Sequence, residues 1–184
     1  MRQLSWPLLI LALIAHFGCE RVATVKSPKT YHKDGIHFQH PGNWKVTSDS
    51  RRDGVRYLFV ETPGQATTAI QIYSGSEAGQ IEDFARAFSS IARAEMPKYV
   101  VVGNSTFGAL EDGGGYKSIT EQFSISVFGE EVPHLRFYKQ KQFGNSVVNV
   151  ICQVSNEDED FVAVGFDQIV SSLKYDGVND PTSE

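Results

Sequence analysis

Residues 35–40 alternate between apolar and polar side chains, which is the period of a β-strand. Ile36, Phe38 and His40 fall on one face of this strand. Asp53-Gly54 separates two further extended runs and predicts a tight hairpin turn, because both residue types tolerate a positive φ. The strands predicted after residue 40 cover residues 44–47, 55–61 and 68–73.

Two segments instead space their apolar residues by three and four, which is the period of a helix. The first covers residues 80–96 and ends at Pro97. Its predicted buried stripe consists of Ile81, Phe84, Ala85, Phe88, Ile91 and Ala92. The second helix is predicted to start at a cap formed by Ser155 or Asn156. Its predicted buried stripe consists of Phe161, Val162, Gly165, Phe166, Ile169 and Leu173.

Extended runs return between the two helices, over residues 99–102, 119–127, 135–138 and 148–154. Glu121 falls on the apolar face of the second of these runs, so we expect that strand to leave the core at one end. Tight turns between neighbouring strands imply an antiparallel sheet, and each helix must pack its single apolar stripe against a sheet face. The predicted fold class is α+β, with a central antiparallel β-sheet flanked by helices as an α/β/α sandwich.

Composition agrees with one globular domain rather than a disordered chain. The chain has 184 residues, of which 41% are hydrophobic and 21% charged. A formal net charge of −5 argues against a nucleic acid as partner. Two cysteines exclude a disulfide framework.

The first residues have the pattern of an export signal. Arg2 precedes an apolar run over residues 6–17, which is shorter than the about 20 residues that span a bilayer. A basic start, a short apolar run and then small residues predict a secretory signal peptide over residues 1–18. Gly18-Cys19 at its end resembles the lipobox of bacterial lipoproteins, in which the cysteine is acylated and becomes the first residue. An ordinary signal peptide with a chance cysteine and a short membrane anchor are the alternatives.

The lipoprotein resemblance implies an address and a partner. Cys19 is the predicted lipidation site, and the membrane is contacted through its acyl chains. Glu20 stands where an aspartate would imply retention in the inner membrane, so the resemblance implies the outer membrane, with the domain facing the periplasm. Residues 19–30 are predicted to be a tether, with an edge strand as the alternative, and residues 177–184 a flexible tail.

Several short motifs occur in a characteristic order between residues 31 and 176. They are the strand, proline turn and tryptophan of residues 35–44, the helix opening at 81–84, the glycine turn at 113–115 before two long strands, and the ending at 169–175. In this order they resemble the PsbP-like family, which includes DcrB-related bacterial lipoproteins and shares its fold with Ran-binding Mog proteins. The resemblance implies a PsbP-like domain over residues 31–176 and an accessory or scaffold role. It implies no catalytic activity and no cofactor.

Three histidines near the start of the domain are candidate metal ligands. His32, His37 and His40 lie close together in the sequence, with Asp34 between them. His37 and His40 are three residues apart in a predicted strand, however, so they point to opposite faces. Ordinary surface or hydrogen-bonded histidines are the alternative.

The sequence contains no recognisable catalytic constellation. We therefore expect a non-catalytic cell-envelope lipoprotein that acts through contacts with an envelope protein. The alternative is an envelope module that binds a small ligand or a divalent metal ion. Aromatic residues in the predicted strands could line its groove or belong to the core, and these are Trp44, Tyr57, Phe59 and Tyr73.

Overall fold

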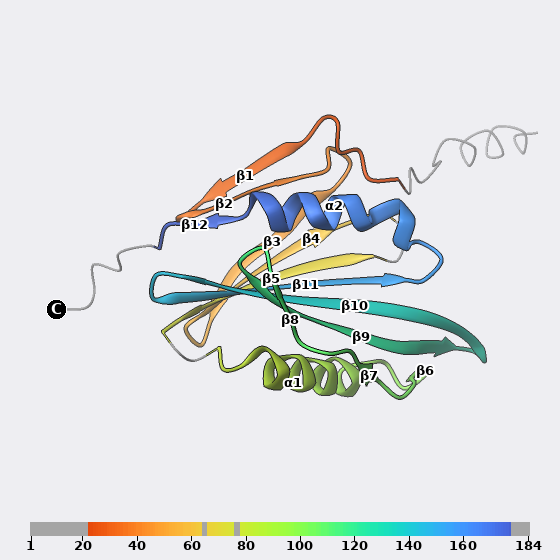
Figure 1. Cartoon of the computed structure of the whole chain (residues 1–184). Coiled ribbons are helices and arrows are strands. Elements are labelled where there is room, and N and C mark those ends of the chain that lie inside the picture. The colour runs from red at the N-terminus through yellow and green to blue at the C-terminus, as the bar shows by residue number, and fades with distance from the viewer. Residues whose placement is uncertain (1–21, 64–65, 76–77, 178–184) are drawn as a thin grey trace, which may run out of the picture.

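The large antiparallel sheet has one helix on each of its two faces (Figure 1). A computed structural model of the chain describes residues 22–63, 66–75 and 78–177. Helix α1 covers Ile81–Ala94, and helix α2 covers Glu159–Ser172. The structure confirms the α+β class and the α/β/α arrangement.

Seven strands follow one another across the large sheet. In spatial order they are β3 (Lys45–Arg52), β4 (Val55–Glu61), β5 (Thr67–Ser74), β11 (Ser146–Ser155), β10 (Glu130–Phe143), β9 (Tyr116–Val127) and β6 (Val100–Val102). Two short strands, β7 (Thr106–Phe107) and β8 (Glu111–Gly113), pair with β9 beside this path. All these pairings are antiparallel, as the tight turns predict.

A small sheet lies on the α2 side of the large one (Figure 1). It contains β1 (Lys29–Lys33), β2 (Ile36–His40) and β12 (Lys174–Tyr175), with β2 in the middle. Arg56 of β4 is 2% exposed and holds the β1–β2 hairpin in place, because it donates to the backbone carbonyls of Asp34 and Lys33. Its Nε also donates to Asp49 Oδ1 at 2.8 Å, and Tyr31 donates to the other oxygen of Asp49 at 2.6 Å.

The main core lies between α2 and the large sheet. Buried aliphatic side chains from four strands and from α2 fill it, including Ile36, Leu58, Val60, Ile70, Val148, Val150 and Ile169. Trp44 contacts Phe166 edge-on, and its ring lies so close to Gly165 that a Cβ there would have no room. The small residue is therefore required at Gly165 for the helix to approach the tryptophan.

The tether prediction is wrong for the part of residues 19–30 that the structure describes. Ala23 is 5% exposed, and its N–H donates to the carbonyl of Phe161 at 2.8 Å. Asn43 binds both neighbours of Ala23, since its amide accepts from the N–H of Thr24 and donates to the carbonyl of Val22. The segment is therefore fixed on the domain, and its last two residues belong to the edge strand β1. Residues 1–21, with Cys19, and the tail from residue 178 lie outside the described residues.

Three details of the helices differ from the sequence prediction. Helix α2 begins at Glu159, after a turn with Asp158 at the N-cap, rather than directly after Ser155 or Asn156. Ile91 and Phe161, both predicted to be buried, are 59% and 40% exposed because they lie at the margins of their stripes.

No helix in the described ranges combines the length and apolar character needed to cross a bilayer.

Candidate functional site

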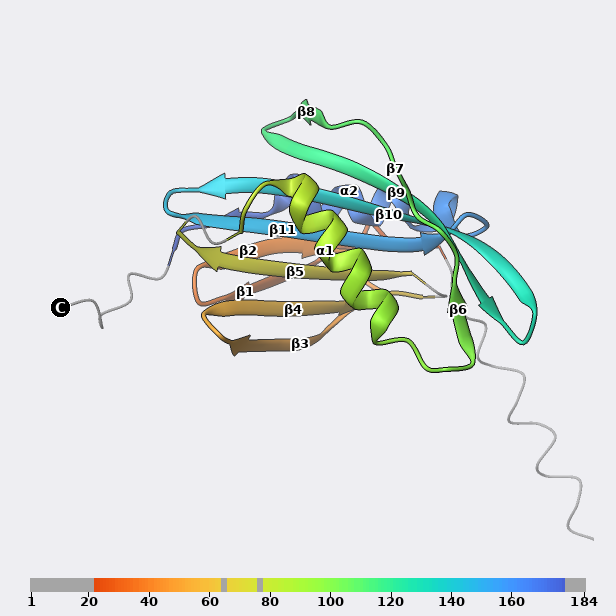
Figure 2. The ribbon, with the colours of Figure 1, turned by 90° about the horizontal axis from the view of Figure 1, so that it is seen from below.

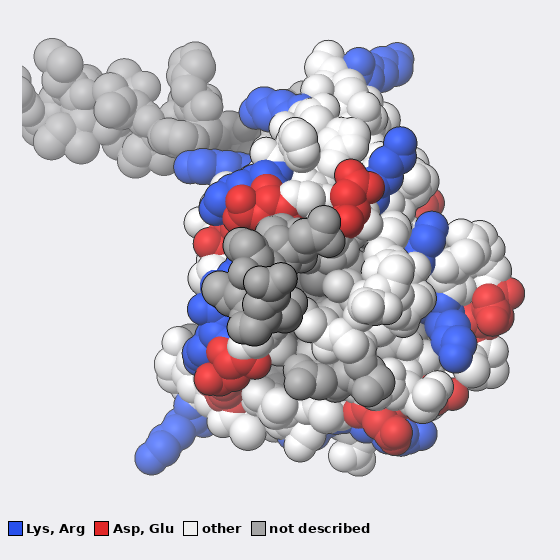
Figure 3. Space-filling view, turned by 90° about the vertical axis from the view of Figure 1, so that its left-hand side faces the viewer, with Lys and Arg blue, Asp and Glu red and all other residues white. Residues whose placement is uncertain are grey.

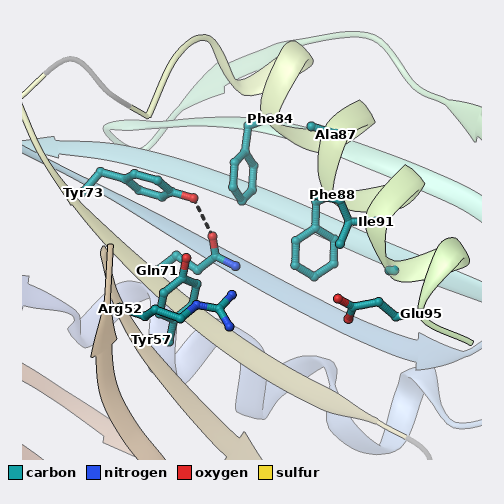
Figure 4. Close-up of a pocket in the computed structure, with 10 residues that line it drawn as sticks. Arg52, Tyr57, Gln71, Tyr73, Phe84, Ala87, Phe88, Ile91 and Glu95 are labelled. Atoms are coloured by element: carbon teal, nitrogen blue, oxygen red, sulfur yellow. Dashed lines mark hydrogen bonds between the residues drawn. The ribbon is translucent and has the colours of Figure 1, made fainter. Parts of the chain in front are cut away.

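A groove lies beside the helix on the α1 side of the sheet. Helix α1 crosses the sheet obliquely and leaves β3 and much of β4 uncovered (Figure 2). The resulting pocket has a volume of about 340 Å³. Its lining comes from β3, β4, β5 and α1 with the residue after it, and comprises Arg52, Tyr57, Gln71, Tyr73, Phe84, Ala87, Phe88, Ile91, Ala92 and Glu95 (Figure 4).

The groove has an apolar wall and a polar aromatic floor. Phe84, Phe88 and Ile91 form the wall on α1 (Figure 4). On the floor, the hydroxyl of Tyr73 donates to Gln71 Oε1 at 2.7 Å. Burial raises the pKa of Tyr73, so this phenol stays neutral near pH 7 and remains a hydrogen-bond donor. The arrangement can hold an amphipathic group, with its apolar part on the helix and its polar part on the strands.

Charge enters the groove only at its rim. Arg52, from β3, lies on the strand side of the groove, and Glu95, which follows α1, lies on the helix side (Figure 4). Both residues are exposed. The guanidinium of Arg52 lies 6.0 Å from the centre of the Tyr57 ring. An apolar centre with a charged rim is the usual anatomy of a protein interface.

A buried carboxylate lies under the inner side of α1. Glu121 of β9 is 0% exposed and forms an ion pair with Arg136 of β10, with 2.8 Å between Oε2 and Nη1. It also accepts hydrogen bonds from Tyr138, Ser105 and Ser89. Burial alone would raise the pKa of Glu121, but these hydrogen bonds and the charge of Arg136 outweigh it and lower the pKa. The carboxylate is therefore ionised in the folded protein.

The same network supports the wall of the groove. The guanidinium of Arg136 lies 4.5 Å from the Phe123 ring centre and 5.3 Å from that of Phe88. Its Nε and Nη2 donate to Gln153 Oε1 at 3.0 and 2.6 Å. The Tyr138 ring contacts Phe88 edge-on at 5.9 Å. Because Phe88 lines the groove, the buried ions fix the position of a groove residue without reaching solvent themselves.

Strand β9 becomes half-buried over its last four residues, but it does not leave the core at Glu121. Glu121 stays on the buried face because Arg136 stands directly opposite it in the β9–β10 pair. One signal in the sequence could have found this partner. A two-residue turn at Phe128-Gly129 sets the register of the hairpin and places Glu121 opposite Arg136.

The structure does not bring the three candidate histidines together. His32 and His37 face each other across β1 and β2, with 5.9 Å between ring centres. His40 lies on the other face of β2, is 5% exposed, and has its Nδ1 3.0 Å from the carbonyl oxygen of Pro41. Burial lowers the pKa of His40. Within the described part of the chain, no group of three histidine, cysteine or acidic residues is placed to hold a metal ion.

The remaining candidates divide between core and surface. Cys152 is 2% exposed, and burial raises the pKa of its thiol to about 12, which makes it an inert core residue. Trp44 belongs to the core, whereas Tyr57 and Tyr73 line the groove. Phe59 lies on the groove face of β4, two residues from Tyr57, and is 38% exposed.

At the end of the molecule shown in Figure 3, acidic and basic side chains are interspersed rather than gathered into a patch of one sign.

Comparison with known proteins gives a match at the level of structure alone. No protein-family model matches the chain, and no curated protein matches it in sequence. The solution structure of cyanobacterial PsbP (CyanoP) from Synechocystis is 15% identical, with a TM-score of 0.55, and the match covers 81% of this chain and 92% of that one.

Two further solved structures match less closely. The Ran-binding protein Mog1p of Saccharomyces cerevisiae is 7% identical with a TM-score of 0.47, over 82% of this chain and 96% of that one. LpqN of Mycobacterium tuberculosis, described as involved in cell envelope biogenesis, is 12% identical with a TM-score of 0.44, over 80% and 88%. The similarity to cyanobacterial PsbP, together with the helices on both faces of the antiparallel sheet, shows that this chain has the PsbP-like fold.

Proposed function

We propose that this protein is a non-catalytic accessory module of the bacterial cell envelope that binds a segment of a partner protein in the groove beside α1. The groove itself carries the proposal. Ile91 is 59% exposed on its wall, and the floor continues onto the uncovered β4, where Phe59 is 38% exposed. An apolar strip that runs out onto an open sheet face suits an extended protein segment, with Arg52 and Glu95 at the rim to orient it.

The environment of the ionisable residues supports a binding role rather than catalysis. Glu121 has four hydrogen-bond partners on the α1 face but is 0% exposed, so no substrate reaches it. The groove offers phenol, amide and apolar side chains, which suit recognition better than acid–base chemistry at neutral pH.

A small ligand is the second candidate for the same groove. The volume of about 340 Å³ falls within the range of ligand sites, which is about 300–1,000 Å³. The hydrogen-bonded pair of Tyr73 and Gln71 offers a polar contact on the floor. Native mass spectrometry of the protein purified under mild conditions tests this candidate, because a bound small molecule appears as a discrete added mass.

A pair of matched substitutions tests the protein-binding proposal. Ile91 of α1 and Val164 of α2 are both aliphatic helix residues, 59% and 51% exposed. In pull-downs from solubilised membranes, Ile91→Glu should lose a reproducible partner that the wild type and Val164→Glu retain. Loss of the partner in both variants, or in Val164→Glu alone, would place the contact elsewhere. An added small mass that disappears in Ile91→Glu would instead favour the second candidate.

Attachment to the membrane through Cys19 is part of the same proposal. The Gly18-Cys19 pattern at the end of the predicted signal supports it. Intact-mass analysis of the membrane fraction should show a chain that begins at Cys19 and carries acyl chains, and the outer-membrane fraction should contain most of it. The Cys19→Ala variant should lack this mass. A wild-type chain that is soluble and unacylated would contradict the anchoring.

A further inference from the structure

Four hairpin turns within the described residues have a positive φ at both central residues, among them Gly114-Gly115 between β8 and β9 with 62° and 76°. Asp34-Gly35 has φ values of 45° and 77°, and Asp53-Gly54 has 51° and 77°. Phe128-Gly129, between β9 and β10, has 52° and 90°. Such turns favour asparagine, aspartate or glycine at the first position, and a bulky side chain with positive φ is a rare outlier. Phe128 is therefore not explained by the turn that contains it.

Packing within the domain does not explain Phe128 either. Its side chain is 88% exposed, the largest exposure among the large hydrophobic residues of the described segments. Its ring stacks on that of Tyr99, with 6.0 Å between centres and an angle of 6°, but Tyr99 is itself 62% exposed. Val101 on the neighbouring edge strand β6 is 63% exposed. We call Tyr99, Val101 and Phe128 the aromatic tip.

The aromatic tip and the start of the described chain lie at the same end of the molecule. Both are on the right-hand side in Figures 1 and 2, where the β9–β10 hairpin ends and the red N-terminal segment begins. That segment is fixed to the domain by the hydrogen bonds of Ala23 and Asn43. Cys19 is only three residues before Val22 in the sequence, and a chain spans at most about 3.6 Å per residue. Acyl chains on Cys19 would hold this end of the domain close to the lipid.

We infer that the aromatic tip inserts into the headgroup region of the membrane and, with the acyl chains on Cys19, fixes the orientation of the domain. This inference rests on the proposed lipid attachment. Tyrosine and other amphipathic or aromatic rings are favoured at membrane interfaces, where one side meets hydrocarbon and the other meets water. Insertion of the tip would give the domain a second contact with the membrane besides the acyl chains. Two contacts fix which side of the domain faces the lipid.

The charges beside the tip indicate which lipid suits it. Glu130 and Glu131 follow Phe128-Gly129 directly and are exposed, and with the exposed Lys98 before Tyr99 they leave a net negative charge beside the tip. They would be repelled by anionic headgroups, so apolar insertion rather than electrostatic attraction supplies the contact. Vesicles of zwitterionic phospholipid are therefore the appropriate probe.

Tryptophan fluorescence of the acylated full-length protein in such vesicles tests the inference. Phe128→Trp places the reporter at the tip. Asn145→Trp is the matched control, because Asn145 is exposed in the β10–β11 turn at the opposite end of the molecule (Figure 1). Trp44 is 1% exposed and supplies the same buried background in both variants. With lipids brominated near the headgroup, Phe128→Trp should shift its emission to the blue and lose intensity, whereas Asn145→Trp should do neither.

Each outcome decides a different claim. Protein that carries no acyl mass and does not float with the vesicles would contradict the lipid attachment, not only the tip. Floating protein in which Phe128→Trp is unquenched, or in which Asn145→Trp is quenched equally, would overturn the inference alone. A blue shift in native membranes but not in protein-free vesicles would mean that a protein covers the tip, which also overturns it.

A third variant separates the lipid contact from the fold. Phe128→Asp gives this turn the Asp-Gly pair found at Asp34-Gly35 and Asp53-Gly54, so the domain should fold at least as stably as the wild type. With Tyr99→Trp as the reporter, adding Phe128→Asp should reduce the quenching by brominated lipid. Unchanged quenching in this double variant would contradict an inserted tip.

Discussion

The two faces of the large sheet are built on different principles. On the α2 side the apolar core is large, and the buried Arg56 pairs with Asp49 beside it, under the β1–β2 hairpin. On the α1 side a much smaller apolar cluster surrounds the ionised Glu121 and Arg136, and a groove opens beside the helix. The comparison shows that one face supplies most of the hydrophobic stabilisation. The α1 side has the smaller apolar cluster and an incompletely covered surface, which is where binding sites are expected.

The largest effect should come from breaking the buried ion pair on the α1 face. Glu121→Ala leaves the guanidinium of Arg136 in the interior without its counter-ion and should lower the free energy of unfolding by about 3–5 kcal/mol. Urea denaturation measures this change. The double variant Glu121→Leu/Arg136→Met removes both charges and should recover much of the loss, since apolar pairs can replace buried ions. A double variant as unstable as the single one would show that the network, rather than the unpaired charge, stabilises this face.

A matched pair of truncations compares the core with the groove. Ile169 of α2 is 0% exposed, so Ile169→Ala should cost about 2–5 kcal/mol through lost burial and a cavity. Ile91 is 59% exposed, and Ile91→Ala should change the free energy of unfolding by less than about 0.5 kcal/mol. Thermal or urea unfolding of both variants decides the point. A large loss for Ile91→Ala would make the groove wall part of the core and would remove the contrast between the faces.

Acid should destabilise both faces, in two stages. Burial lowers the pKa values of His40 and His134, so the unfolded chain takes up these protons first and stability falls as the pH drops through about 6.5. The pKa of Asp49 is lowered chiefly by its hydrogen bonds from Arg56, and that of Glu121 is lowered as well. Their stabilisation is present above about pH 4 and is lost as the pH falls towards their folded-state values. Urea midpoints between pH 7.5 and 3.5 measure both stages, and stability that rises on acidification would contradict this assignment.

The α2 face could be predicted from the sequence much further than the α1 face. The alternation of Ile36, Phe38 and His40 and the stripe of α2 gave the correct buried sides, because those patterns are local. The partners of Glu121 come from Ser89, Ser105 and Arg136, which only the register of β9 and β10 and the placement of α1 bring together. Apolar periodicity carries no information about a buried ion pair, so it places Glu121 on the apolar face but predicts no partner for it. Of the strand aromatics that could line a groove, Tyr57 and Tyr73 do so because the oblique crossing of α1 leaves them uncovered, whereas Trp44 belongs to the core. The sequence does not give this crossing angle, so it could not separate the two cases.

The central claim is that the α1 face binds and the α2 face stabilises. The most direct measurement is photocrosslinking in intact cells from a photoreactive residue at position 91 or at position 164, which are similarly exposed in the wild type. We expect a discrete adduct with an envelope protein from position 91 and none from position 164. Adducts of equal yield from both positions, or from position 164 alone, would contradict the assignment of binding to the groove beside α1.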